Sequence, residues 1–105
     1  PVPEHVFERA VDIVRRTRPA TDDCPKWVKE SVQWGAGPRA IQFLIRGAKA
    51  RAVIQGNFIT TSEDLDAVAE AALDHRIITN FHARSEGISS SDVVRRLIEE
   101  ASKEE

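Results

Sequence analysis

The segment WGAGPR, residues 34–39, and the helical pattern that follows it to Gly56 decide how we interpret this chain. Pro38 suits the first position of a helix, because the N–H that proline lacks has no partner within the helix and its ring presets φ. Gly37 and Pro38 therefore mark a helix start. Arg39 then lies in the first turn, where free backbone N–H groups and the helix dipole favour an anion. We interpret Arg39 as a candidate phosphate-contacting residue.

The residues that follow predict one long amphipathic helix over about 38–55. At 100° per residue its apolar stripe contains Ile41, Leu44, Ile45, Ala48 and Ala52. The opposite side carries Arg39, Gln42, Arg46 and Lys49. Phe43 also projects away from the apolar stripe. Two interpretations stay open, a solvated basic face with one aromatic side chain packed on a neighbouring helix, or a face that meets an anionic ligand.

Most of the remaining chain also predicts helices. The periodicity indicates helices over 3–17, 26–33 and 61–78, and a last helix that opens at Ser89. Their expected core residues are Val6, Phe7, Ala10, Val11, Val14, Trp27, Val28, Leu65, Val68, Ala69, Ala72, Leu73, Val93, Val94, Leu97, Ile98 and Ala101. Residues 79–88 are predicted to form a loop. The fold class is an all-α bundle of four or five helices.

Short signals set the ends of these helices. Gly56 is expected in the left-handed conformation just past the long helix. Two capping boxes are predicted, one joining Thr61 to Asp64 and one joining Ser89 to Asp92. The runs 58–59 and 77–78 are compatible with β structure, so one very short β bridge between them fits the pattern.

Composition describes one ordinary globular domain over residues 1–105. The net charge of −2 and the pI near 5.9 argue against a dedicated nucleic-acid-binding domain, which is usually basic. No apolar run approaches the roughly 18 residues that a membrane span needs. Cys24 is the only cysteine, so neither a disulfide framework nor a cysteine metal site is expected. We expect a cytoplasmic protein without a membrane span or a nucleic-acid partner.

Several blocks together resemble the lid domain of MoxR-type AAA+ ATPases. The resemblance covers about residues 5–98. Its blocks, in matching order and spacing, are Val32-Gln33-Trp34-Gly35-Ala36-Gly37-Pro38-Arg39-Ala40, Ala48-Lys49-Ala50-Arg51-Ala52, Thr61-Ser62-Glu63-Asp64-Leu65, Leu73-Asp74-His75-Arg76-Ile77, Asn80-Phe81 and Glu86-Gly87-Ile88. The first block alone is moderately specific, whereas the set is strongly so.

The resemblance implies a nucleotide-sensing role. In that family the arginine of the Pro-Arg pair is the sensor-2 residue, which reaches the nucleotide phosphates, and the matching position here is Arg39. Gly37 and Pro38 would lie near the nucleotide. ATP and Mg²⁺ would bind between this lid and an α/β core of the same protein. The family also implies a ring-shaped homo-oligomer, a chaperone-like motor and von Willebrand factor A-domain partners.

The chain lacks the parts that would make it a complete ATPase. It has no G-x-x-x-x-G-K-[ST] phosphate loop and no strand that ends in a Walker B carboxylate pair. It also begins at Pro1 rather than Met. We therefore expect the C-terminal lid of a longer enzyme, with the nucleotide-binding core absent and no ATP turnover by these residues alone.

Other candidate chemistry is weaker. The three histidines His5, His75 and His82 have no metal-ligand spacing, and the three serines 89–91 have no histidine partner. Glu63-Asp64 is explained by capping, and a structural role at the end of its helix is favoured for His75-Arg76. Trp34 is expected to be a core anchor, the alternative being a contact with adenine or with the core domain.

Two further functions belong to other classes. Phe43 and its neighbours could serve a helical protein-interaction module. The basic face between Arg39 and Lys49 could serve as a DNA-recognition helix, although the acidic charge balance disfavours it. Salt-dependent DNA binding would identify the second of these.

Overall fold

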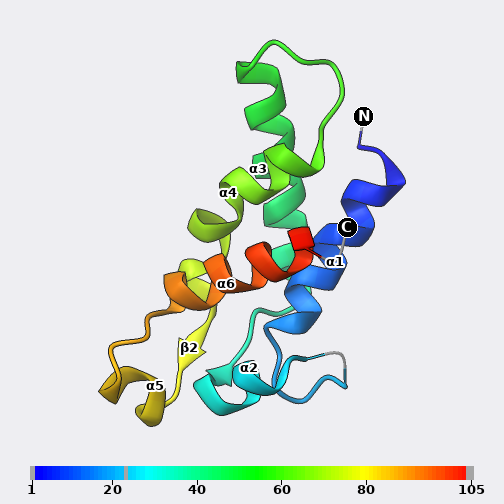
Figure 1. Ribbon diagram of the computed structural model, residues 1–105. Coiled ribbons are helices and arrows are strands. Elements are labelled where there is room, and N and C mark those ends of the chain that lie inside the picture. Colours follow the sequence, from blue (N-terminus) through cyan, green and yellow to red (C-terminus); the bar gives the residue numbers. More distant parts are fainter. Residues whose placement is uncertain (1, 23, 104–105) are drawn as a thin grey trace.

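The computed structural model describes residues 2–22 and 24–103, and these form a helical bundle with a tiny β ribbon (Figure 1). The elements are α1 (Glu4–Arg16), α2 (Lys26–Ser31), β1 (Val32–Trp34), α3 (Arg39–Ile54), α4 (Ser62–Leu73), the 3₁₀ turn η1 (Asp74–Arg76), β2 (Ile78–Thr79), α5 (Phe81–Ser85) and α6 (Ser90–Lys103). The predicted all-α bundle is confirmed. No helix in the described part of the chain has the length and apolar character needed to cross a membrane.

The long helix α3 begins and ends as its sequence predicts. Pro38 has helical dihedral angles (φ −58°, ψ −29°) and directly precedes Arg39, the first residue of α3. Past the other end, Gly56 has a φ of +79°, which a residue with a side chain rarely adopts. The N–H of Gly56 donates to Val53 O, and the N–H of Asn57 donates to Ala52 O. These two bonds form a Schellman motif, which satisfies carbonyls at the end of the helix.

The core forms where α3 and α4 pack together and α1 and α6 close around them. The buried side of α3 consists of three alanines and one leucine, namely Ala40, Leu44, Ala48 and Ala52, with Ile41 and Ile45 partly buried. Gly47 lets α4 approach closely, because a Cβ there would lie 3.3 Å from Val68 Cγ2. Phe7 was predicted to be a core residue, but it is half exposed. Ile13 fills the core instead.

Two polar contacts between distant segments join the helices. Arg9 of α1 is buried and makes a two-pronged ion pair with Asp66 of α4, with both N–O distances 2.8 Å. The indole N–H of Trp27 donates to Glu100 of α6, and the guanidinium of Arg96 lies 4.3 Å above the same ring. Trp27 is therefore the tryptophan that anchors helices to one another.

The β ribbon has a different partner from the one predicted. β2 pairs antiparallel with β1, with Val32 opposite Thr79 and Trp34 opposite Ile78 across a bulge. The run 58–59 lies instead in the connector between α3 and α4, exposed to solvent. Sequence pattern alone missed β1 because residues 26–33 continue the helical spacing of α2.

The segment after α4 also corrects the prediction. α4 ends at Leu73 rather than near residue 78, and η1 leads from it into β2. Residues 81–85, expected in a loop, form α5 because Asn80 caps it, its side-chain oxygen accepting from Ala83 N–H at 2.8 Å. The amide of the same side chain donates to Glu30 O, which fixes α5 against α2.

Candidate functional site

Arg39 is exposed at the start of α3, as the sequence predicts. Within residues 2–22 and 24–103, its guanidinium has no ion pair or hydrogen bond. Most other arginines of the fold have a hydrogen-bond or ion-pair partner. For example, Arg51 donates to Asp64 and Arg84 donates to Thr79 O. A free guanidinium at a helix N-terminus, where the helix dipole is positive, makes this end of α3 a surface suited to an anion. Gly37 and Pro38, the other predicted site residues, are exposed beside it.

The approach to Arg39 is held by backbone contact with the end of α1. The N–H of Ala36 donates to the buried Thr17 hydroxyl at 3.0 Å, and that hydroxyl donates to Val14 O at 2.6 Å. A Cβ on Gly35 would lie 2.3 Å from Thr17 O, so only glycine allows this approach. These contacts fix the position from which α3 begins.

Trp34 is not the core anchor that its size predicts. It is 64% exposed, and its partner across the ribbon, Ile78, is exposed as well. The turn is anchored by Gly35, Ala36 and Thr17 instead. The sequence signal for this anchoring lay in the small residues of the segment, because glycine next to alanine is typical where two backbones approach closely.

Arg76, the last residue of η1, connects the end of α4 to α3. Its guanidinium lies 4.1 Å from the centroid of the Phe43 ring, and it donates to Ala72 O at 2.7 Å. These contacts agree with the structural role favoured for His75-Arg76. Phe43 follows Arg39 by one helical turn, so both project from the same side of α3. We call Trp34, Arg39, Phe43, Arg76 and Ile78 together the α3-start face.

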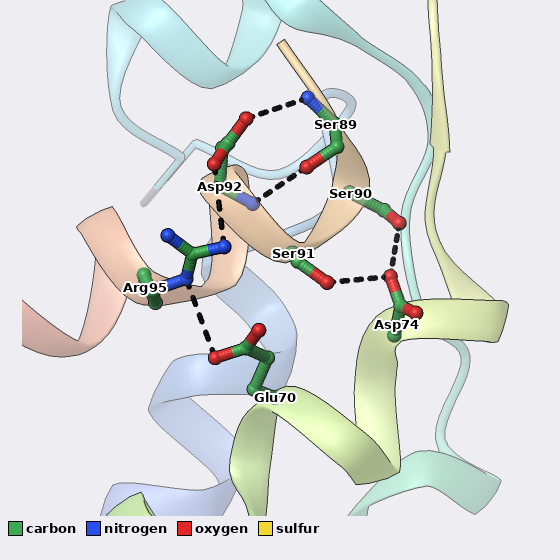
Figure 2. Close-up of polar contacts among 7 residues, drawn as sticks. All are labelled: Glu70, Asp74, Ser89, Ser90, Ser91, Asp92 and Arg95. Carbon is green, nitrogen blue, oxygen red and sulfur yellow. Dashed lines mark hydrogen bonds and ion pairs between the residues drawn. The ribbon is translucent and has the colours of Figure 1, made fainter.

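The three serines 89–91 form a helix start, as their capping pattern predicts (Figure 2). Ser89 and Asp92 exchange backbone-to-side-chain hydrogen bonds of 2.9 and 3.2 Å. The hydroxyls of Ser90 and Ser91 both donate to Asp74, which holds the pKa of that carboxyl below its ordinary value. The cluster binds α6 to the end of α4, and the Asp74 carboxylate is the hydrogen-bond partner of both serine hydroxyls.

Neither the histidines nor the cysteine forms a second site. Among the described residues, no group of three or more His, Cys, Asp or Glu side chains could hold a metal ion. Cys24 is buried, and this burial raises the pKa of its thiol, which disfavours the reactive thiolate. The α3-start face is therefore the best candidate for a functional site.

The family model for the AAA lid domain matches residues 25–97. The chain belongs to the AAA lid domain family. Two relatives are MoxR proteins. Chaperone MoxR1 of Mycobacterium tuberculosis is 31% identical over 72 residues, which are 69% of this chain and 19% of MoxR1. Protein MoxR of Methylorubrum extorquens is 41% identical over 46 residues, which are 44% of this chain and 13% of MoxR.

Two further matches cover nearly the whole lid. The uncharacterised protein YeaC of Bacillus subtilis is 28% identical over 95 residues, which are 90% of this chain and 27% of YeaC. The crystal structure of a candidate ATPase from Cytophaga hutchinsonii aligns with a TM-score of 0.83 at 28% identity, covering 93% of this chain and 30% of that protein. The resemblance to a MoxR-type lid domain is thus confirmed. The chain spans less than a third of the length of each relative it matches.

Proposed function

We propose that this lid closes over ATP bound to the α/β core of a longer MoxR-type ATPase and senses its phosphates through Arg39. Support comes from the one observation that Arg39 is exposed, unpaired among the described residues and at the N-terminus of α3. A guanidinium can bind phosphate oxygens through two parallel hydrogen bonds. Because loss of the γ-phosphate removes that contact, the orientation of the lid would follow the state of the nucleotide.

The remainder of the α3-start face suits contact with the core. Trp34 and Ile78 are paired across the ribbon and exposed, and Arg76 contacts Phe43 of α3. An aromatic and aliphatic surface with arginines is typical of interface centres. In the longer enzyme this surface would pack on the core, and the edge of the Trp34 indole would lie near adenine.

The wider setting follows from the family. The catalytic cofactors would be ATP and Mg²⁺, both held mainly by the core. Ring assembly, a chaperone-like motor function, von Willebrand factor A-domain partners and a cytoplasmic location belong to the same proposal. The lid acts as a sensor and lever, and residues 1–105 alone are expected not to hydrolyse ATP.

Steady-state ATP turnover of the full-length enzyme tests the proposal through Arg39→Ala. We expect turnover to fall by about tenfold to a thousandfold, the range seen when one charge-stabilising donor is removed. Arg46→Ala is the matched control, since Arg46 is exposed on α3 two turns further on. It should change turnover less than twofold.

Melting temperature and ATP affinity complete this test. Both variants should melt within a few degrees of the wild type, because neither arginine contacts the core of the lid. Equal turnover for Arg39→Ala and the wild type would reject the sensor role and leave Arg39 as a surface charge. Equal losses for both variants would indicate a general electrostatic effect rather than a positioned contact.

A further inference from the structure

A groove runs between α1 and α3, which lie side by side in the bundle (Figure 1). Phe7 of α1 and Ile41 and Ile45 of α3 line it, and its volume is about 260 Å³. A second hollow of about 410 Å³ begins at Phe7 and continues along α1 past Val11. These four side chains make one apolar surface, which we call the α1–α3 groove.

The protein itself covers this apolar surface only in part. Phe7 is 50% exposed. Ile41 and Ile45 pack on the core with one side and remain partly exposed on the other. An apolar depression of this kind can bury the anchoring side chains of a partner, because the partner then replaces water against the lining residues.

The groove faces a different direction from the α3-start face. At about 100° per residue, Ile45 lies roughly 120° around α3 from Arg39 and roughly 160° from Phe43. A core packed on the α3-start face would therefore leave the groove accessible. The inference drawn from the groove goes beyond the proposed function and does not depend on a nucleotide contact by Arg39.

Charged residues of opposite sign flank the groove. Lys49 lies on its α3 side and Glu8 on its α1 side. Both are exposed, and neither has an ion pair or hydrogen bond within residues 2–22 and 24–103. Asp12, also on the α1 side, already pairs with Arg16 at 3.0 Å. An occupant can therefore pair with Lys49 on one flank and with Glu8 on the other.

This combination of charges distinguishes between classes of occupant. Nucleic acids and anionic membrane surfaces carry charge of one sign, so Glu8 and Asp12 would repel them. A small apolar ligand would use neither charge. An amphipathic helix fits, because its aliphatic side chains recur on one face while its two flanks can carry opposite charges. The stretch of α3 from Ile41 to Lys49 is about 12 Å long, which two turns of a docked helix match.

We propose that the α1–α3 groove docks an amphipathic helix of a partner protein. Aliphatic side chains of that helix pack on Phe7, Ile41 and Ile45. A carboxylate on one flank pairs with Lys49, and a lysine or arginine on the other flank pairs with Glu8. The docked helix then lies against α1 and α3 at the ordinary distance of about 8–10 Å between helix axes.

Fluorescence anisotropy of the full-length enzyme with a dye-labelled synthetic peptide tests this proposal. The probe has about 18 residues, or five helical turns, with leucines on one face, glutamates on one flank and lysines on the other. A scrambled peptide of the same composition is its control. We expect the wild type to bind the probe with a dissociation constant on the order of 10 µM and the scrambled peptide at least about tenfold more weakly.

Phe7→Ser shows where the probe binds. This variant should weaken binding by at least about tenfold, because it removes the apolar centre of the groove. The matched control is Phe81→Ser, which changes an aromatic side chain of α5 that is 79% exposed. It should alter the affinity less than about twofold. Both variants should melt within a few degrees of the wild type, because both side chains lie at the surface.

Lys49→Glu tests the charge pattern. Because it makes both sides of the groove acidic, it should weaken the probe about fivefold. It should strengthen, by a similar factor, a second peptide that carries lysines on both flanks. Lys29→Glu makes the same charge change at an exposed position of α2 and should alter neither affinity more than about twofold. Equal effects of the two lysine variants would reject the assigned pairing.

Three outcomes overturn the proposal as a whole. One is a wild type that binds no probe up to about 1 mM, which would mean that the core or a second copy covers the groove. The second is equal binding of the probe and the scrambled peptide. The third is equal affinity of Phe7→Ser and Phe81→Ser for the probe. Turnover of Arg39→Ala is measured without peptide, so the outcome for the sensor role stays separate.

Discussion

Gly35→Ala is expected to destabilise the domain by about 3 kcal/mol, at the upper end of the range for an overpacked buried site. The added Cβ would lie 2.3 Å from Thr17 O, 2.6 Å from Thr17 C and 2.7 Å from Arg18 Cα. All three atoms are backbone, so no side-chain rotation relieves the clash. The segment must move away from α1, which also breaks the bond from Ala36 N–H to Thr17. Thermal unfolding should show a fall of about 15 °C.

The control for this prediction lies two residues further along. Gly37 also has an ordinary negative φ, and a Cβ there meets nothing within 4 Å. Gly37→Ala should therefore leave the melting temperature unchanged or raise it slightly, because alanine restricts the unfolded chain. If both variants melted alike, close backbone approach would not be what holds this turn.

Local signals predicted the helices well because each depends on a few adjacent residues. Pro38 set the start of α3, Gly56 its end, and Thr61 with Asp64 the start of α4. The apolar stripe of α3 was predicted for the same reason, because its residues recur every three or four positions along the sequence. The position of Arg39 on the surface follows from these local features together.

Features that depend on distant segments were predicted poorly. Trp34 and Trp27 look alike in sequence, yet within the described part of the chain only the Trp27 indole has a side-chain hydrogen bond, to Glu100, 73 residues away. The pairing of β1 with β2 depends on where α2 and α4 end, which periodicity locates only approximately. The contact of Arg76 with Phe43 likewise joins two helices whose packing is visible only in three dimensions.

Asp64→Ala should lower the melting temperature by about 10 °C at neutral pH, because one carboxylate serves three partners. Asp64 accepts from the backbone N–H of Thr61 at 2.9 Å, from the Thr61 hydroxyl at 3.0 Å and from Arg51 at 2.7 Å. It is 1% exposed, so water cannot replace these bonds. Asp92→Ala is the matched control, an equivalent capping-box residue with a half-exposed side chain, and should cost only a few degrees.

The pH dependence of that difference tests the charge itself. The Thr61 N–H, then the Thr61 hydroxyl and Arg51, hold the pKa of Asp64 below its ordinary value. A lowered folded-state pKa adds stability above the unfolded-state value of about 3.9, and that stability is lost as the pH falls through the folded-state pKa. The difference in melting temperature between the wild type and Asp64→Ala should therefore have its full size above about pH 5 and become smaller toward pH 2. Asp74 and Asp92 titrate alike in both proteins, so their contributions cancel. A gap that stays constant down to the most acidic pH would show that Asp64 acts through packing rather than through its charge.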